Sequence, residues 1–162
     1  MNWEAISAIG QIVGALAVVI SLIYLAREIR SNARAARVAS METLIRWLGQ
    51  LGAHPHLREL YYRGVRDFNS LEGADFVGFG VLMNQLFHIF NEMYYQRLDG
   101  HLDPRVWRQV EGPLRDIIAY PGVQAWWRLR SHWFSEEFVK FVDQLRQTAG
   151  PPSMYREPNP DQ

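Results

Sequence analysis

Residues 5–26, AISAIGQIVGALAVVISLIYLA, form a run of 22 residues without a charge, and arginines follow it at once. A helix rises about 1.5 Å per residue, so this run would extend about 33 Å, enough to cross a hydrocarbon core of about 30 Å. The run therefore predicts a transmembrane helix, which we place at residues 1–27. The residues that follow this helix are expected to form the rest of the fold.

Three other interpretations of this run fit the sequence less well. A cleaved signal peptide needs a basic start, a shorter apolar stretch and a small-residue cleavage site, whereas here Glu4 precedes the run and Arg27 ends it. A buried core helix seldom continues past twenty residues without a charge. An interfacial helix needs a charged face, and this run offers only Ser7, Gln11 and Ser21 as polar side chains.

The flanking charges predict the orientation of the helix. Five arginines and two glutamates lie between residues 27 and 46, while the four residues before the run include Glu4 and no basic residue. The positive-inside rule then places the N-terminus outside and the rest of the chain in the cytoplasm. The arginines expected to contact lipid headgroups are Arg27, Arg30, Arg34 and Arg37.

The remaining residues suffice for one small domain, expected at 28–149, with a proline-rich tail at 150–162. Residues 47–162 hold twelve basic and fourteen acidic residues, so nucleic acid is not an expected partner. The absence of cysteine agrees with a reducing compartment.

Every structured segment has the pattern of a helix, so the predicted fold class is all-α. The membrane helix should continue into the domain until Gly49, Gly52 and Pro55 stop it. Further helices are expected over 56–67 and 71–98, the second ending at Asp99-Gly100. Helix starts are expected at Asp103-Pro104, at Pro121 and at Ser135.

Four segments carry a resemblance to known proteins: SLIYLAREIRSNARAAR (21–37), ELYYRGVRD (59–67), FNEMYYQRLDGHLDP (90–104) and PGVQAWWRLRSHWFSEEFVKFVDQL (121–145). In this order they cover most of the chain. The chain resembles a group of uncharacterised bacterial proteins with one N-terminal transmembrane helix and a small helical cytoplasmic domain. The group has no established activity, so the resemblance implies an architecture and no site residues.

The apolar run also contains a regular stripe. Its positions are spaced alternately by four and three residues, the pattern of a left-handed helix pair: Ser7, Gln11, Gly14, Val18, Ser21 and Leu25. Gly10 and Gly14 add a Gly-x-x-x-Gly pair, which lets helix backbones approach closely in lipid. The stripe predicts self-association, with chance occurrence of small residues as the alternative. A pore lined by its Ser, Gln and Gly residues is a second hypothesis.

No other pattern predicts a catalytic, cofactor or metal site. His88 and Glu92 lie one turn apart, but carboxylate-bundle metal sites use Glu-x-x-His pairs, so a solvent-facing polar stripe or an internal network is the better interpretation. Trp126, Trp127 and Trp133 could contact a membrane or a partner, although core packing is favoured in a domain this small.

The sequence therefore predicts a membrane-anchored helical protein that assembles and binds without catalysis. The expected partners are the lipid bilayer and further copies of the chain, with another membrane protein as an alternative. A homo-oligomeric channel is the second hypothesis, and an enzyme without a recognisable motif is the third.

Overall fold

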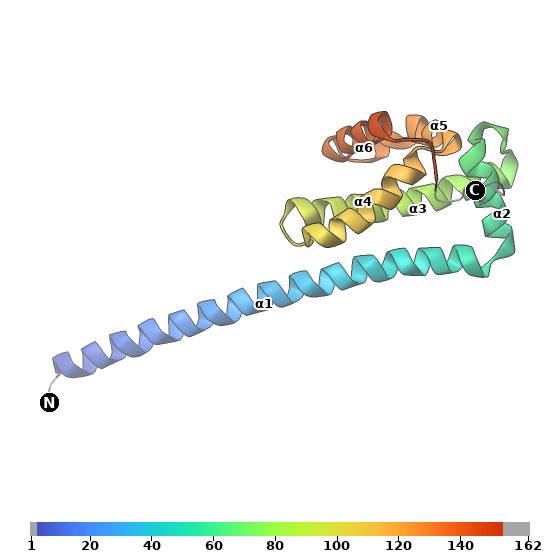
Figure 1. Ribbon diagram of the computed structural model, residues 1–162. Helices are drawn as coiled ribbons and strands as arrows, with labels where there is room; N and C mark the ends of the chain where they lie inside the picture. The colour runs from blue at the N-terminus through green and yellow to red at the C-terminus, as the bar shows by residue number, and fades with distance from the viewer. Residues whose placement is uncertain (1–2, 154–162) are drawn as a thin grey trace, which may run out of the picture. The chain divides into compact units, whose positions relative to one another are not determined.

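The computed structural model describes residues 3–153, with side chains at positions 11, 14–28 and 40–153. Within this part of the chain every regular element is helical, which confirms the all-α prediction (Figure 1). The elements are α1 (Trp3–Ala53), α2 (Pro55–Arg66), η1 (Phe68–Ser70), α3 (Gly73–Leu98), α4 (Pro104–Ile118), α5 (Pro121–Arg130), η2 (Ser131–Trp133) and α6 (Glu136–Thr148), where η1 and η2 are 3-10 turns.

The contacts divide the chain into two units, Met1–Val38 and Ala39–Gln162. The first unit contains most of α1. The second contains the end of α1 and all later helices, and its described residues are called the helical domain below. Within this domain α2 packs against α3 and α5, while α4 packs against α3 and α6.

Local sequence signals set several helix boundaries as expected. Pro104 and Pro121 lie at the first positions of α4 and α5, where the missing proline N–H leaves no hydrogen bond unmade. The Asp103 carboxylate accepts a hydrogen bond of 2.7 Å from the backbone N–H of Arg105 and so caps α4. Helix α3 ends at Leu98, and Gly100 then adopts a positive φ of 71°.

Two boundary details differ from the expectation. Gly49 and Gly52 do not stop α1, which continues to Ala53, because Trp47 and Leu51 in this last part are buried in the domain core. Their packing outweighs a helix penalty of about 1 kcal/mol per glycine. Ser135 precedes α6 as predicted, but its hydroxyl donates to Asn91 Oδ1 at 3.4 Å instead of capping the helix.

The core of the helical domain is dominated by aromatic rings. Phe87 of α3 stacks on Trp127 with ring centroids 5.0 Å apart and contacts Trp126 at 5.1 Å. Phe138 of α6 adds an edge contact to Trp127. The indole N–H of Trp127 donates to Asp143 Oδ1 at 3.1 Å, so this buried N–H has a hydrogen-bond partner. Trp126 and Trp127 are therefore core residues, as favoured by the sequence, but Trp133 is half exposed.

Helices α2 and α5 cross at a pair of glycines. A Cβ added at Gly122 would lie 2.8 Å from the Val65 carbonyl oxygen and 2.9 Å from the Phe68 backbone nitrogen, and closer still to the Gly64 carbonyl oxygen. A Cβ added at Gly64 would overlap the ring of Phe79. The missing side chain at Gly122 thus allows the close approach of α2 and α5, and the one at Gly64 leaves room for the Phe79 ring of α3.

Candidate functional site

The first unit presents an exposed apolar helix surface. The described side chains from residue 14 to residue 28 are all exposed. The large apolar ones each expose half of their surface or more: Leu16, Val18, Val19, Ile20, Leu22, Ile23, Tyr24 and Leu25. A helix that is apolar around its circumference needs a covering other than water.

The stripe predicted for self-association lies partly within the described residues. Gln11, Gly14 and Ser21 are described and exposed, and no atom lies within 4 Å of a Cβ added at Gly14. The Ser21 hydroxyl donates to the Ala17 carbonyl oxygen of its own helix at 2.8 Å, so its oxygen is left mainly as an acceptor for a neighbour. The side chains of Ser7 and Gly10 lie outside the described residues.

The predicted headgroup contacts are described only in part. Arg27 is exposed, as a lipid contact would require. The side chains of Arg30, Arg34 and Arg37 lie outside the described residues. The role of these four arginines therefore stays a prediction.

Over the residues that the structure describes, no helix combines the length and the apolar character needed to cross a membrane. The predicted span at 5–26 includes residues 5–10, 12 and 13, whose side chains lie outside the described residues.

In the helical domain, the polar stripe of α3 faces the end of α1. The Gln96 amide donates to Ser40 Oγ at 2.7 Å and to Glu92 Oε1 at 3.1 Å, and Gln96 is itself buried. His88 is exposed, and its ring packs on Phe134 with centroids 4.8 Å apart. Among the described residues no group of three His, Cys, Asp or Glu side chains could hold a metal ion. His88 and Glu92 are both exposed, and Glu92 also takes part in the internal network through Gln96.

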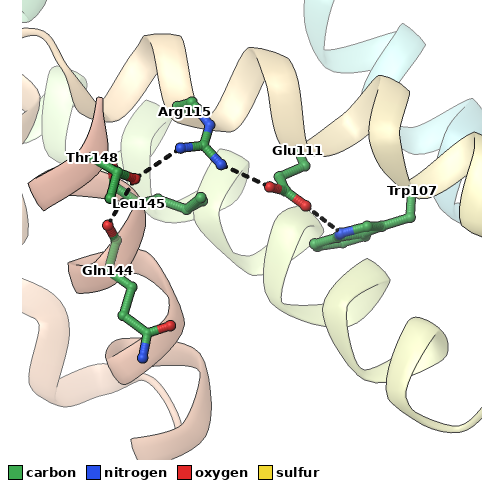
Figure 2. Close-up of polar contacts among 6 residues, drawn as sticks. All are labelled: Trp107, Glu111, Arg115, Gln144, Leu145 and Thr148. Atoms are coloured by element: carbon green, nitrogen blue, oxygen red, sulfur yellow. Dashed lines mark hydrogen bonds and ion pairs between the residues drawn. The ribbon is translucent and has the colours of Figure 1, made fainter. Parts of the chain in front are cut away.

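A second polar network, which the sequence analysis missed, joins α4 to α6 (Figure 2). Glu111 accepts the indole N–H of the buried Trp107 at 2.7 Å and pairs with Arg115 at 2.9 Å. Arg115 then donates to the Thr148 hydroxyl at 2.8 Å. Trp107, Glu111 and Arg115 are spaced four residues apart, so the sequence alone could have placed their side chains on one face of a helix. Thr148 lies too far along the chain to be identified from it.

This network borders a hollow of about 640 Å³ whose lining includes Arg97, Glu137 and Lys140. The Arg97 guanidinium lies 5.1 Å from the centroid of the Trp107 ring. Lys140 forms an ion pair of 2.6 Å with Glu136, and this hydrogen bond lowers the pKa of the Glu136 carboxyl and raises the pKa of Lys140. The Arg115–Thr148 hydrogen bond links α4 to α6 in this network.

Comparison of the sequence with protein-family models found no match, and comparisons with curated proteins and with solved structures found none either. The resemblance to bacterial proteins with one transmembrane helix stays a prediction.

Proposed function

We propose that this chain is a membrane-anchored helical protein that self-associates through the stripe Ser7, Gln11, Gly14, Val18, Ser21 and Leu25 of α1. The proposal assigns binding and assembly to the chain and no catalysis. Its membrane is the bacterial inner membrane, with the N-terminus outside and the helical domain in the cytoplasm.

The observation that carries the proposal is the exposure of the apolar side chains between Leu16 and Leu25. Each of them would cost free energy in water, about 25 cal/mol for every Å² left uncovered. Lipid covers such a surface on all sides, and a second helix covers one stripe of it. The sequence adds the charge pattern: the run contains no ionisable side chain except the phenol of Tyr24, and Arg27 follows directly.

The stripe is the part of this surface that suits a second copy of the helix. Gly14 leaves open space at its Cβ position, so a partner backbone could approach there closely. Gln11 offers an amide that can hydrogen-bond across an interface, and Ser21 offers an acceptor oxygen. Leu16 and Ile23 point away from the stripe by helix geometry and are assigned to lipid.

Anchoring and association are tested separately in membranes. Full-length protein should remain with the membrane after washing with alkaline carbonate, and its release into the supernatant would contradict the anchor. Because the chain has no cysteine, single-cysteine variants report the interface without background. Val18→Cys and Leu25→Cys should form disulfide-linked dimers on mild oxidation, while Leu16→Cys and Ile23→Cys, on the opposite face, should not.

A substitution test complements the cross-linking. Gly14→Ile inserts a branched side chain into the stripe and should weaken oligomers in detergent, whereas Leu16→Ile preserves volume on the opposite face and should not. Equal cross-linking at all four cysteine positions, or the same oligomer size for both variants, would refute the proposed interface.

A further inference from the structure

A second apolar surface lies on the helical domain, where α3 meets η2. It surrounds a hollow of about 250 Å³ whose walls include Val77, Gly80 and Val81 of α3, Trp126 and Arg130 of α5, and Trp133 of η2. Val77 is 62% exposed, Val81 is 56% exposed and Trp133 is 50% exposed. We call Val77, Val81, Arg130 and Trp133 the α3–η2 surface.

The exposed side chains of the α3–η2 surface lie beside fully buried ones. Trp126 forms the floor of the hollow and is fully buried. Position 80 carries no side chain, and a Cβ added there would have only Trp126 Nε1 within 4 Å, at 3.9 Å. Gly80 therefore leaves a gap between Val77 and Val81 that an apolar group can enter.

The charges around this surface are positive. The Arg130 guanidinium lies 4.8 Å from the centroid of the Trp133 ring, and Arg128, two residues earlier in α5, is exposed. Within the described residues neither arginine forms an ion pair, although Arg46, Arg63, Arg115 and Lys140 all pair with carboxylates. No carboxylate lines the hollow.

We propose that the α3–η2 surface binds the surface of an anionic phospholipid bilayer. Tryptophan favours the headgroup layer, where its apolar ring and its N–H are both accommodated. Val77 and Val81 would enter the boundary of the acyl chains, and Arg128 and Arg130 would contact lipid phosphates. Each arginine near such a surface strengthens binding about fivefold.

This contact goes beyond the proposed function, which assigns the bilayer to α1 and self-association to its stripe. The chemistry favours lipid over an acidic protein partner because exposed apolar groups and a half-exposed indole lie beside Arg130, which forms no ion pair within the described residues. An anchored chain would also hold the surface at a high effective concentration near the bilayer, so weak affinity suffices.

The test uses full-length protein carrying one fluorescent label on a single introduced cysteine, reconstituted in lipid nanodiscs with spin-labelled lipid as quencher. The label is placed at Val81→Cys, and the matched control is Gln109→Cys on the exposed face of α4. In discs that contain phosphatidylglycerol, the label at 81 should be quenched severalfold more than the label at 109. Near-UV circular dichroism establishes that both variants are folded.

Charge dependence identifies the lipid as the partner. Quenching at position 81 should fall severalfold in discs of phosphatidylcholine alone. It should also fall severalfold at about 0.5 M NaCl, where charges are almost fully screened beyond about 5 Å. The Arg128→Gln, Arg130→Gln variant should show the same fall. Equal quenching at 81 and 109 would overturn the proposal. Quenching at 81 that is indifferent to phosphatidylglycerol and salt would overturn it too.

Failure of this contact can be told from failure of the anchor. With preformed vesicles in place of discs, a chain without an anchor floats with the vesicles only at low salt and only if the α3–η2 surface binds lipid. An anchored chain floats at all salt concentrations, whatever the label at position 81 reports. Loss of low-salt flotation in Arg128→Gln, Arg130→Gln by an unanchored chain would support the surface contact, and unchanged flotation would overturn it.

Discussion

The sharpest stability prediction concerns Gly122, at the crossing of α2 and α5. In Gly122→Ala the new methyl group would meet three backbone groups of the segment that it faces: the carbonyl oxygens of Gly64 and Val65 and the backbone nitrogen of Phe68. Ordinary contacts of a Cβ begin near 3.4 Å, so the methyl group is too close to Val65 and Phe68 by about 0.5 Å and to Gly64 by more. None of these atoms can move by a simple side-chain rotation.

Relief therefore requires α2 and α5 to separate by about 1 Å. Inserting a methyl group into a packed core commonly costs about 1–3 kcal/mol, and occasionally more. We expect a loss of at least about 3 kcal/mol here, because the obstacles are backbone atoms and because separation also loosens Val123 and Trp126. For a domain of this size that loss lowers the melting temperature by about 10 °C or more.

The measurement is thermal and urea unfolding of full-length protein in mild detergent, followed by near-UV circular dichroism of the buried tryptophans. The matched control is Gly49→Ala. Gly49 also lies in a helix, but it is exposed and no atom lies within 4 Å of an added Cβ. This control should gain about 0.5–1 kcal/mol from the better helix propensity of alanine. A loss of less than about 1 kcal/mol in Gly122→Ala, with an unchanged near-UV spectrum, would refute the reasoning.

Three further predictions follow from polar contacts of the helical domain. Glu111→Ala leaves the buried Trp107 N–H and Arg115 without their carboxylate and should cost about 2 kcal/mol in urea unfolding, while Thr148→Ala should cost about 0.5 kcal/mol; equal losses would contradict the central place of Glu111. A double-mutant cycle of Asp143→Ala with Trp127→Phe should give a coupling energy of about 1–2 kcal/mol, and strict additivity would show that the 3.1 Å hydrogen bond adds nothing. The lowered pKa of Glu136 and the raised pKa of Lys140 predict a small difference in unfolding free energy between wild type and Glu136→Gln that is constant at neutral pH. That difference should vanish as the pH falls through the lowered pKa of Glu136 or rises through the raised pKa of Lys140, and a difference that grows toward acid would contradict the pairing.

Local chemistry made the helix boundaries largely predictable. Asp103 with Pro104 and the pair Asp99-Gly100 act within one turn of chain, so their effect can be read from neighbouring residues alone. The prediction that Gly49 and Gly52 stop α1 was wrong because the end of this helix depends on distant residues. Whether a glycine ends a helix depends on what the next turn packs against, and the burial of Leu51 is decided by distant residues.

Tertiary contacts were much harder to predict. The sequence favoured the core for all three tryptophans, but only Trp126 and Trp127 pack there, since the short turn η2 leaves Trp133 at the surface. The pairing of Gly64 with Gly122 has no local signature at all. The bond from Arg115 to Thr148 likewise joins helices whose relative placement the sequence does not encode in any short pattern.

The crossing of α2 and α5 also has a consequence for the order in which the chain folds. It joins segments about 60 residues apart, and closing a loop of that length costs about 3.5 kcal/mol of chain entropy before any contact forms. During synthesis α2 and α3 leave the ribosome well before α5, so Phe87 must wait for its tryptophan neighbours. We therefore expect the nascent chain to expose an aromatic surface until residues beyond Trp127 have emerged, a stage at which chaperone binding would matter most.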